Sequence, residues 1–157
     1  MDAKLLSCGK FEIPEALAFD HEALCAELSR AAMEPGPIGK AAERAALLCR
    51  MHFAAEEEIV FRAFGLLHDL AAGRVRPDMD PVAPLIARFT AQHLGLRDYH
   101  QSISVAIEEL LQEARKDGNQ EIAELVDNLR NHERIENLVM YPTMLFIDSS
   151  VRESLRA

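Results

Sequence analysis

Two histidines in this chain are each followed four residues later by a glutamate: His52 by Glu56, and His132 by Glu136. Residues four apart share one face of an α-helix, so each pair presents an imidazole and a carboxylate about 6 Å apart. Both pairs fall on the stripe of an amphipathic segment that should face inward. A buried carboxylate without a partner costs several kcal/mol. Metal ions between the helices remove that cost, because carboxylates can bridge two ions while imidazoles bind at the ends.

The other two amphipathic segments each carry a histidine on the inward stripe as well. His21 lies at the height of the first pair, counted at about 1.5 Å of rise per residue. On the third segment, His100 matches the height of the second pair better than His93 does. An internal repeat favours His93, because residues 20–24 (DHEAL) read like residues 92–96 (QHLGL). We therefore predict His93 as the ligand and keep His100 as the alternative. The two are about 10 Å apart along a helix and should not bind the same ion.

These ligands must be positioned by four helices, because helical periodicity runs through most of the sequence. The expected helices span about 14–33, 38–72 and 80–116, and the fourth begins after Asn119 as N-cap. Pro142 lies inside the fourth pattern and should kink or end that helix. Amphipathic helices with short connections predict an all-α fold, an up-down-up-down antiparallel four-helix bundle. We expect one domain over residues 1–157, with its core at about 14–147.

Composition narrows the class of protein. The chain has 157 residues, of which 49% are apolar, and a formal net charge of −9. Such an acidic surface argues against nucleic acid or an anionic membrane as a partner. Apolar runs fall short of the roughly 20 residues that span a bilayer, and we predict no signal peptide. Three cysteines without CxxC spacing fit a reducing compartment, so we expect a cytoplasmic protein. The sequence leaves open whether two copies pair as a homodimer.

Other reactive side chains lie near the predicted ligands. Cys25 and Cys49 should lie on the same side of the metal layer, either as small buried apolar groups or as a thiol pair that peroxide oxidises. His68, twelve residues past Glu56, is expected to be structural or solvent-facing. Several carboxylates flank the ligands and should form a solvated surface, although one could support a ligand; these are Glu22, Glu57, Glu58 and Glu133.

Four stretches of the sequence resemble the hemerythrin-like family, also called HHE cation-binding domains, over about residues 14–147. They are DHEAL around His21, HFAAEEEIVF from His52, QHLGLR around His93 and HERIENLVMYP from His132. The resemblance implies a four-helix bundle with a non-haem di-iron centre, bridged by carboxylates and by an oxo or hydroxo group. Carried over residue by residue, it implies terminal ligands and bridging carboxylates as follows: His21, His52, His93 and His132, with Glu56 and Glu136 as the bridges.

One departure from the family bears on function. Oxygen-carrying hemerythrins have a second histidine four residues after the first on the third helix, where this chain has Arg97. The site should therefore be more open than that of a simple oxygen carrier. We predict a di-iron protein that binds O₂, peroxide or NO, or that senses iron or redox state. The alternatives are a di-iron oxidase or peroxidase and a structural module that binds Zn, and Mn is a further candidate metal. The His-x-x-x-Glu order differs from the Glu-x-x-His order of ferritin-like enzymes, which favours a binding protein over an enzyme.

Overall fold

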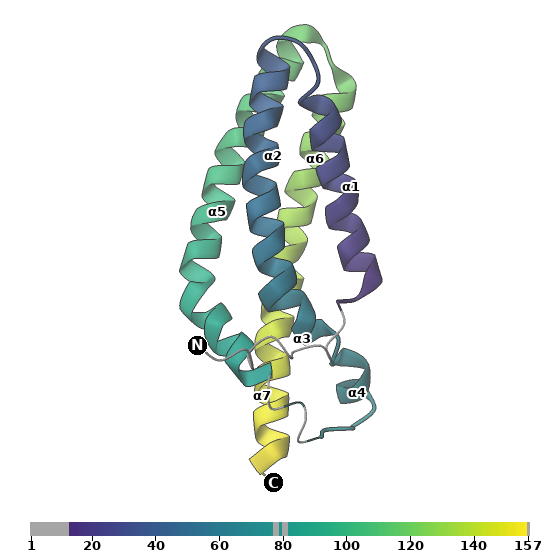
Figure 1. Cartoon of the computed structure of the whole chain (residues 1–157), viewed down its shortest axis with the longest axis vertical. Coiled ribbons are helices and arrows are strands. Elements are labelled where there is room, and N and C mark those ends of the chain that lie inside the picture. Colours follow the sequence, from purple (N-terminus) through teal and green to yellow (C-terminus); the bar gives the residue numbers. More distant parts are fainter. Residues whose placement is uncertain (1–12, 77–78, 80–81, 157) are drawn as a thin grey trace, which may run out of the picture.

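The computed structural model describes residues 13–76, 79 and 82–156, without the side chains of residues 83, 86, 90, 92–98, 155 and 156. All regular elements in these described ranges are helical, as Figure 1 shows. The all-α prediction is thereby confirmed. No helix in the described part of the chain is both long and apolar enough to cross a membrane.

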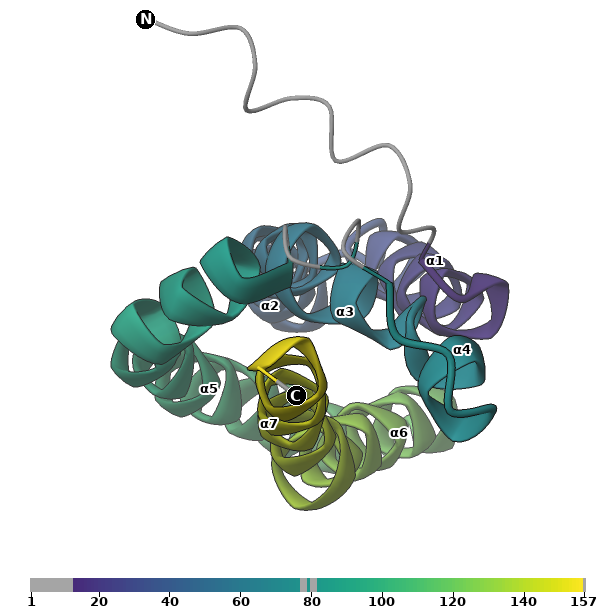
Figure 2. The ribbon, with the colours of Figure 1, turned by 90° about the horizontal axis from the view of Figure 1, so that it is seen from below.

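Four long helices lie side by side. They are α1 (Glu15–Ala31), α2 (Pro37–Glu56), α5 (Val82–Asp117) and α6 (Gln120–Ile135). Helix α2 packs against α1 and α5, α5 packs against α6, and α6 returns to contact α1. The four therefore enclose a common interior, which Figure 2 shows in a view along the long axis.

The second predicted helix, 38–72, proves to be subdivided, so its prediction as one continuous helix was wrong. After α2 comes a π-helical turn, η2 (Glu57–Phe61), then the short helices α3 (Arg62–Phe64) and α4 (Leu67–Ala71). The interruption between α3 and α4 begins at Gly65, a residue that costs about 1 kcal/mol in a helix interior relative to alanine. Leu66 beside it is buried in the core.

The fourth predicted helix is longer than expected. Asn119 caps α6 as predicted, because its side-chain oxygen accepts from the Ile122 backbone N–H at 3.2 Å. After α6 a second π-helical turn, η4 (Glu136–Met140), leads directly into α7 (Tyr141–Arg156). Pro142 therefore does not end the helix. The wider π turn before it displaces the carbonyl that the proline ring would meet in a regular α-helix.

The hydrophobic core is divided into two clusters. The upper cluster joins α1, α2, α5 and α6 through residues such as Leu28, Cys49, Ile107 and Leu129. The lower cluster joins η2, α3, α5, η4 and α7 through residues such as Phe61, Phe89, Met144 and Ile147. The buried polar residues of the described chain lie next to the positions at which the sequence passes from one cluster to the other: His21, His52, Glu56, His100, His132 and Glu136. A polar layer thus separates two apolar ones.

Candidate metal centre

The polar layer draws its side chains from all four long helices. His21 comes from α1, His52 and Glu56 from α2, His100 from α5 and His132 from α6, while Glu136 is the first residue of η4. All six are buried, and the two glutamates are 0% and 1% exposed. They form two groups of four in which the potential ligand atoms lie within 4.8 Å of one another.

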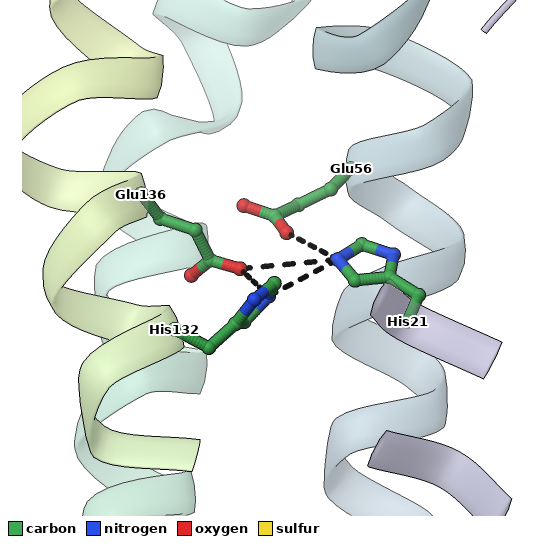
Figure 3. Close-up of side chains that lie close together, drawn as sticks. All are labelled: His21, Glu56, His132 and Glu136. Atoms are coloured by element: carbon green, nitrogen blue, oxygen red, sulfur yellow. Dashed lines mark hydrogen bonds and ion pairs between the residues drawn. The ribbon is translucent and has the colours of Figure 1, made fainter. Parts of the chain in front are cut away.

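The first group consists of His21, Glu56, His132 and Glu136 (Figure 3). Nε2 of His21 lies 3.5 Å from Oε2 of Glu56, 4.0 Å from Oε1 of Glu136 and 3.2 Å from Nε2 of His132. Nε2 of His132 lies 2.5 Å from the same Glu136 oxygen. Two nitrogen and two oxygen atoms therefore converge on one point between α1, α2 and α6.

The second group consists of His52, Glu56, His100 and Glu136. Nε2 of His52 lies 3.6 Å from Oε1 of Glu56 and 3.3 Å from Oε2 of Glu136. Nε2 of His100 lies 3.0 Å from that Glu136 oxygen and 2.9 Å from Nε2 of His52. Both glutamates belong to both groups, and each offers one oxygen to either side.

These spacings fit a metal ion in each group. An ion about 2.1 Å from four tetrahedrally arranged atoms holds those atoms about 3.4 Å apart, and the distances above scatter around that value. Among the described residues, Oε2 of Glu56 and Oε1 of Glu136 form no hydrogen bond although both are fully buried, and they lie against the imidazoles of His21 and His132 instead. These are the oxygens that face the first group, and a cation there would satisfy them. The cluster can therefore hold metal through imidazole and carboxylate ligands.

Protons stabilise the cluster when no metal is bound. Burial opposes ionisation of Glu136, yet the three imidazoles around it hold its pKa well below the usual range. Burial also favours neutral histidine, but the Glu136 carboxylate prevails and raises the pKa of His132 to about 9. The pKa of His100 rises for the same reason. Glu56 behaves oppositely, because burial raises its pKa more than His21 lowers it. Metal ions must displace protons from this cluster in order to bind.

Three of the four imidazoles also have a partner behind them. Nδ1 of His21 lies 3.0 Å from a Glu57 oxygen, and Nδ1 of His132 lies 2.6 Å from an Asp20 oxygen. Nδ1 of His100 lies 3.3 Å from the Asn137 amide nitrogen. A carboxylate behind a ligand histidine fixes the tautomer that leaves Nε2 bare for a metal. Of the flanking acidic residues that the sequence assigned to the surface, Glu57 therefore supports the site.

A tyrosine lies against the second group. The Tyr141 hydroxyl donates to Oε1 of Glu56 at 2.5 Å and lies 3.3 Å from Nε2 of His100. Its ring stacks on that of His100 with the centroids 5.8 Å apart. Burial, and then the negative charge of Glu56, raise the pKa of Tyr141, so this phenol keeps its proton. The fold thus places one O–H donor beside the carboxylate layer.

The structure brings together five of the six predicted ligands. The side chains of the sixth, His93, and of Arg97 are not among those described, so His93 stays a predicted ligand and the open site inferred from Arg97 stays a prediction. The described side chain that α5 contributes is His100, which the height argument favoured. Constant spacing between the repeats was the signal that could have found it. His132 follows His52 by 80 positions and Glu136 follows Glu56 by 80, while His100 follows His21 by 79.

The remaining candidates belong to neither of the two ligand groups. Cys49 is buried in the wall of a small cavity that His52 and His100 also line, and burial raises its thiol pKa to about 12. Cys25 is half-buried, and burial raises its pKa as well. Both thiols are free and protonated, which makes them slow nucleophiles. His68 is solvent-exposed in α4, as expected.

Comparison with family models, with curated proteins and with solved structures found no match for this chain. Its function must therefore be argued from the geometry of the polar layer.

Proposed function

We propose that this chain is a hemerythrin-like, non-haem di-iron protein of the cytoplasm that binds O₂, peroxide or NO, or reports iron or redox state. In this proposal the long helices form an up-down-up-down antiparallel bundle, and the polar layer at its centre holds two iron ions. The imidazoles of His21 and His132 would bind one ion, and those of His52 and His100 the other. Glu56 and Glu136 would bridge the two.

The observation that carries the proposal is the sharing of the two glutamates. Each carboxylate directs Oε1 to one histidine pair and Oε2 to the other. A single ion would use one group and leave the other with buried, unbalanced charges, which are costly in a low-dielectric interior. Two ions use every oxygen and all four Nε2 atoms. Imidazole and carboxylate together are ligands typical of non-haem iron.

Iron in such a site would supply reversible electron transfer and a coordination position for a small ligand. The chain's own residues restrict what reaches it. The apolar clusters above and below the layer keep bulk water out, and the ring of Phe53 stacks on His21 with centroids 4.0 Å apart, which fixes that imidazole. The Tyr141 hydroxyl donates a hydrogen bond to Glu56, and it would become free to donate to a ligand bound on that side if a metal took this Glu56 oxygen.

Iron reconstitution tests the proposal directly. The metal-free chain is loaded with Fe²⁺ without oxygen, desalted and analysed for iron, and absorption spectra are then recorded with O₂, H₂O₂ and NO. We expect about two iron ions per chain and new ligand-to-metal absorption that differs among the three. The His52→Ala variant is the matched comparison and should bind less iron. A folded chain that retains no iron would refute the proposal.

The second candidate is a structural module with two zinc ions. It is favoured by the four protein ligand atoms in each group, because structural zinc sites are closed in this way. The same preparations discriminate between the two functions. Three results would support the structural role. The chain would retain zinc in preference to iron, it would lose much of its thermal stability on chelation, and its spectrum would not respond to O₂ or NO.

A further inference from the structure

The two halves of the cluster are related by the internal repeat. A shift of 79 or 80 positions carries His21 to His100, His52 to His132 and Glu56 to Glu136. The same shift of 80 carries η2 (Glu57–Phe61) to positions 137–141, which overlap η4 (Glu136–Met140). Each half thus supplies one histidine from its first helix, a His-x-x-x-Glu pair from its second, and a π turn at the glutamate. The ligand atoms obey this symmetry, but the side chains behind them do not.

The first difference lies behind the histidines of α1 and α5. Position 57 is a glutamate whose carboxylate meets Nδ1 of His21 at 3.0 Å. Its counterpart, 80 positions later, is Asn137, whose amide nitrogen lies 3.3 Å from Nδ1 of His100 and also donates to the Glu133 carbonyl at 2.9 Å. An amide nitrogen can only donate. In this orientation it favours the His100 tautomer with a proton on Nε2, the atom that a metal would need.

The second difference lies behind the histidines of the His-x-x-x-Glu pairs. Asp20 places a carboxylate oxygen 2.6 Å from Nδ1 of His132. The position 79 residues later is Tyr99, whose ring centroid lies 6.3 Å from that of His52. Among the described residues, Nδ1 of His52 has no hydrogen-bond partner although it is buried. One half therefore has a carboxylate where the other has an aromatic ring.

Two further groups lie near the metal position between His52 and His100, but neither supplies the carboxylate partner that its histidines lack. The Glu133 carboxylate is 3.9 Å from Nδ1 of His100, which is too far for a hydrogen bond. Glu133 instead accepts a hydrogen bond from the Ser104 hydroxyl at 3.3 Å. Tyr141 donates to Oε1 of Glu56, the oxygen that faces this position, and so competes for the lone pairs that a metal would use. Its counterpart in the other half is Phe61, which has no hydroxyl.

We propose that the two metal positions are unequal: the ion between His21 and His132 binds more tightly and first, and the ion between His52 and His100 exchanges. This inference rests on the proposed two-metal function. Its physical basis is that a carboxylate behind an imidazole orients the ring and makes Nε2 a stronger ligand. Loss of such a partner typically weakens metal binding by about 10- to 100-fold. Glu57 and Asp20 are thus positioning residues for one ion only.

Zinc titration of the metal-free full-length chain tests the inference, because zinc is redox-inactive and counts both positions. Native mass spectrometry gives the number of ions, and competition with a chromophoric chelator gives each affinity. We expect two ions with affinities at least about tenfold apart. Glu57→Gln should weaken the tighter step by about 10- to 100-fold and leave the weaker step unchanged. The reciprocal variant, Asn137→Glu, should strengthen the weaker step.

The matched control is Glu58→Gln, which removes the same charge one residue along. Glu58 is exposed and pairs with Arg88 at 3.0 Å, away from the histidines, so neither step should change. Equal affinities in the wild type, or a Glu57→Gln effect on the weaker step, would overturn the inference while leaving the two-metal site intact. A folded chain that binds no zinc would overturn the site itself. If Glu57→Gln lost its helical circular dichroism, Asn137→Glu would decide: an unchanged weaker step would refute the inference.

Discussion

Replacement of Glu136 by glutamine keeps the side chain's size but leaves one oxygen where the cluster uses two. The wild-type carboxylate faces His132 and His21 with Oε1, and His52 and His100 with Oε2. The variant must present an NH₂ group to one of these pairs, and that group cannot bind a metal. Loss of a ligand should weaken binding at that position by at least about 100-fold, or about 2.7 kcal/mol. We therefore expect at least one of the two zinc-binding steps of the wild type to be weakened by that factor in the variant.

The metal-free form of the same variant provides a second magnitude. Glu136 is 1% exposed and makes the largest contribution, ahead of Asp20 and Glu56, to the rise in the pKa of His132 from 6.5 to about 9. That rise corresponds to about 3 kcal/mol of stabilisation at low pH. Breaking a buried ion pair by removal of one partner costs about 3–5 kcal/mol, in agreement. Urea denaturation in the presence of a chelator at pH 6 should therefore show a loss of about 3 kcal/mol. Two zinc-binding steps with the affinities of the wild type, or unchanged stability at pH 6, would refute the bridging role.

Three further outcomes are expected. The contribution of His132 to the stability of the metal-free wild type should be greatest below pH 6.5 and should fall by about 3 kcal/mol as the pH rises through 9. The reason is that the pKa of His132 in the folded state lies above its value in the unfolded state. A free energy of unfolding that does not change with pH in urea denaturation would contradict this. The Tyr141→Phe variant should bind both ions and should bind the weaker zinc ion severalfold more tightly, because no hydroxyl competes for a lone pair of Glu56. Loss of an ion in the zinc titration would contradict this prediction. Metal analysis should show that His100→Ala loses one ion. The His93→Ala variant and the exposed control His68→Ala should both retain two ions. The reverse result for His93 and His100 would make His93 the ligand.

The helical fold and most of the candidate metal ligands could be predicted from the sequence, because the residues that indicate them recur at helical spacing. The His-x-x-x-Glu pairs lie on stripes of step three and four, and that pattern places imidazole and carboxylate together whatever the details of packing. The N-cap at Asn119 and the break after residue 33 are local signals of the same kind. The all-helical fold and the convergence of His21, His52 and His132 therefore follow from spacing alone.

The features that escaped prediction depend on tertiary context. A π turn adds one residue locally and leaves the apolar pattern almost unchanged, so η2 and η4 resemble ordinary helix in the sequence. Glu57 and Asp20 remain partly exposed, with side chains 36% and 55% accessible, so they look like any solvated acidic residue beside a ligand. The choice of His93 rested on the local likeness of residues 92–96 to residues 20–24, although the spacing of 80 between the other repeated ligands points to His100. Only the packed helices show which imidazole nitrogen each of these groups reaches.

The division of the core into two apolar clusters has a consequence for cooperativity. In most small domains a single continuous core makes unfolding all-or-none. Here each cluster could hold its own end of the molecule, and the six side chains between them repel or attract one another according to what occupies the layer. Cations that draw Glu56 and Glu136 together would couple the two ends into one cooperative unit. The bound ions would then determine not only how stable the chain is, but also whether it unfolds in one step or two.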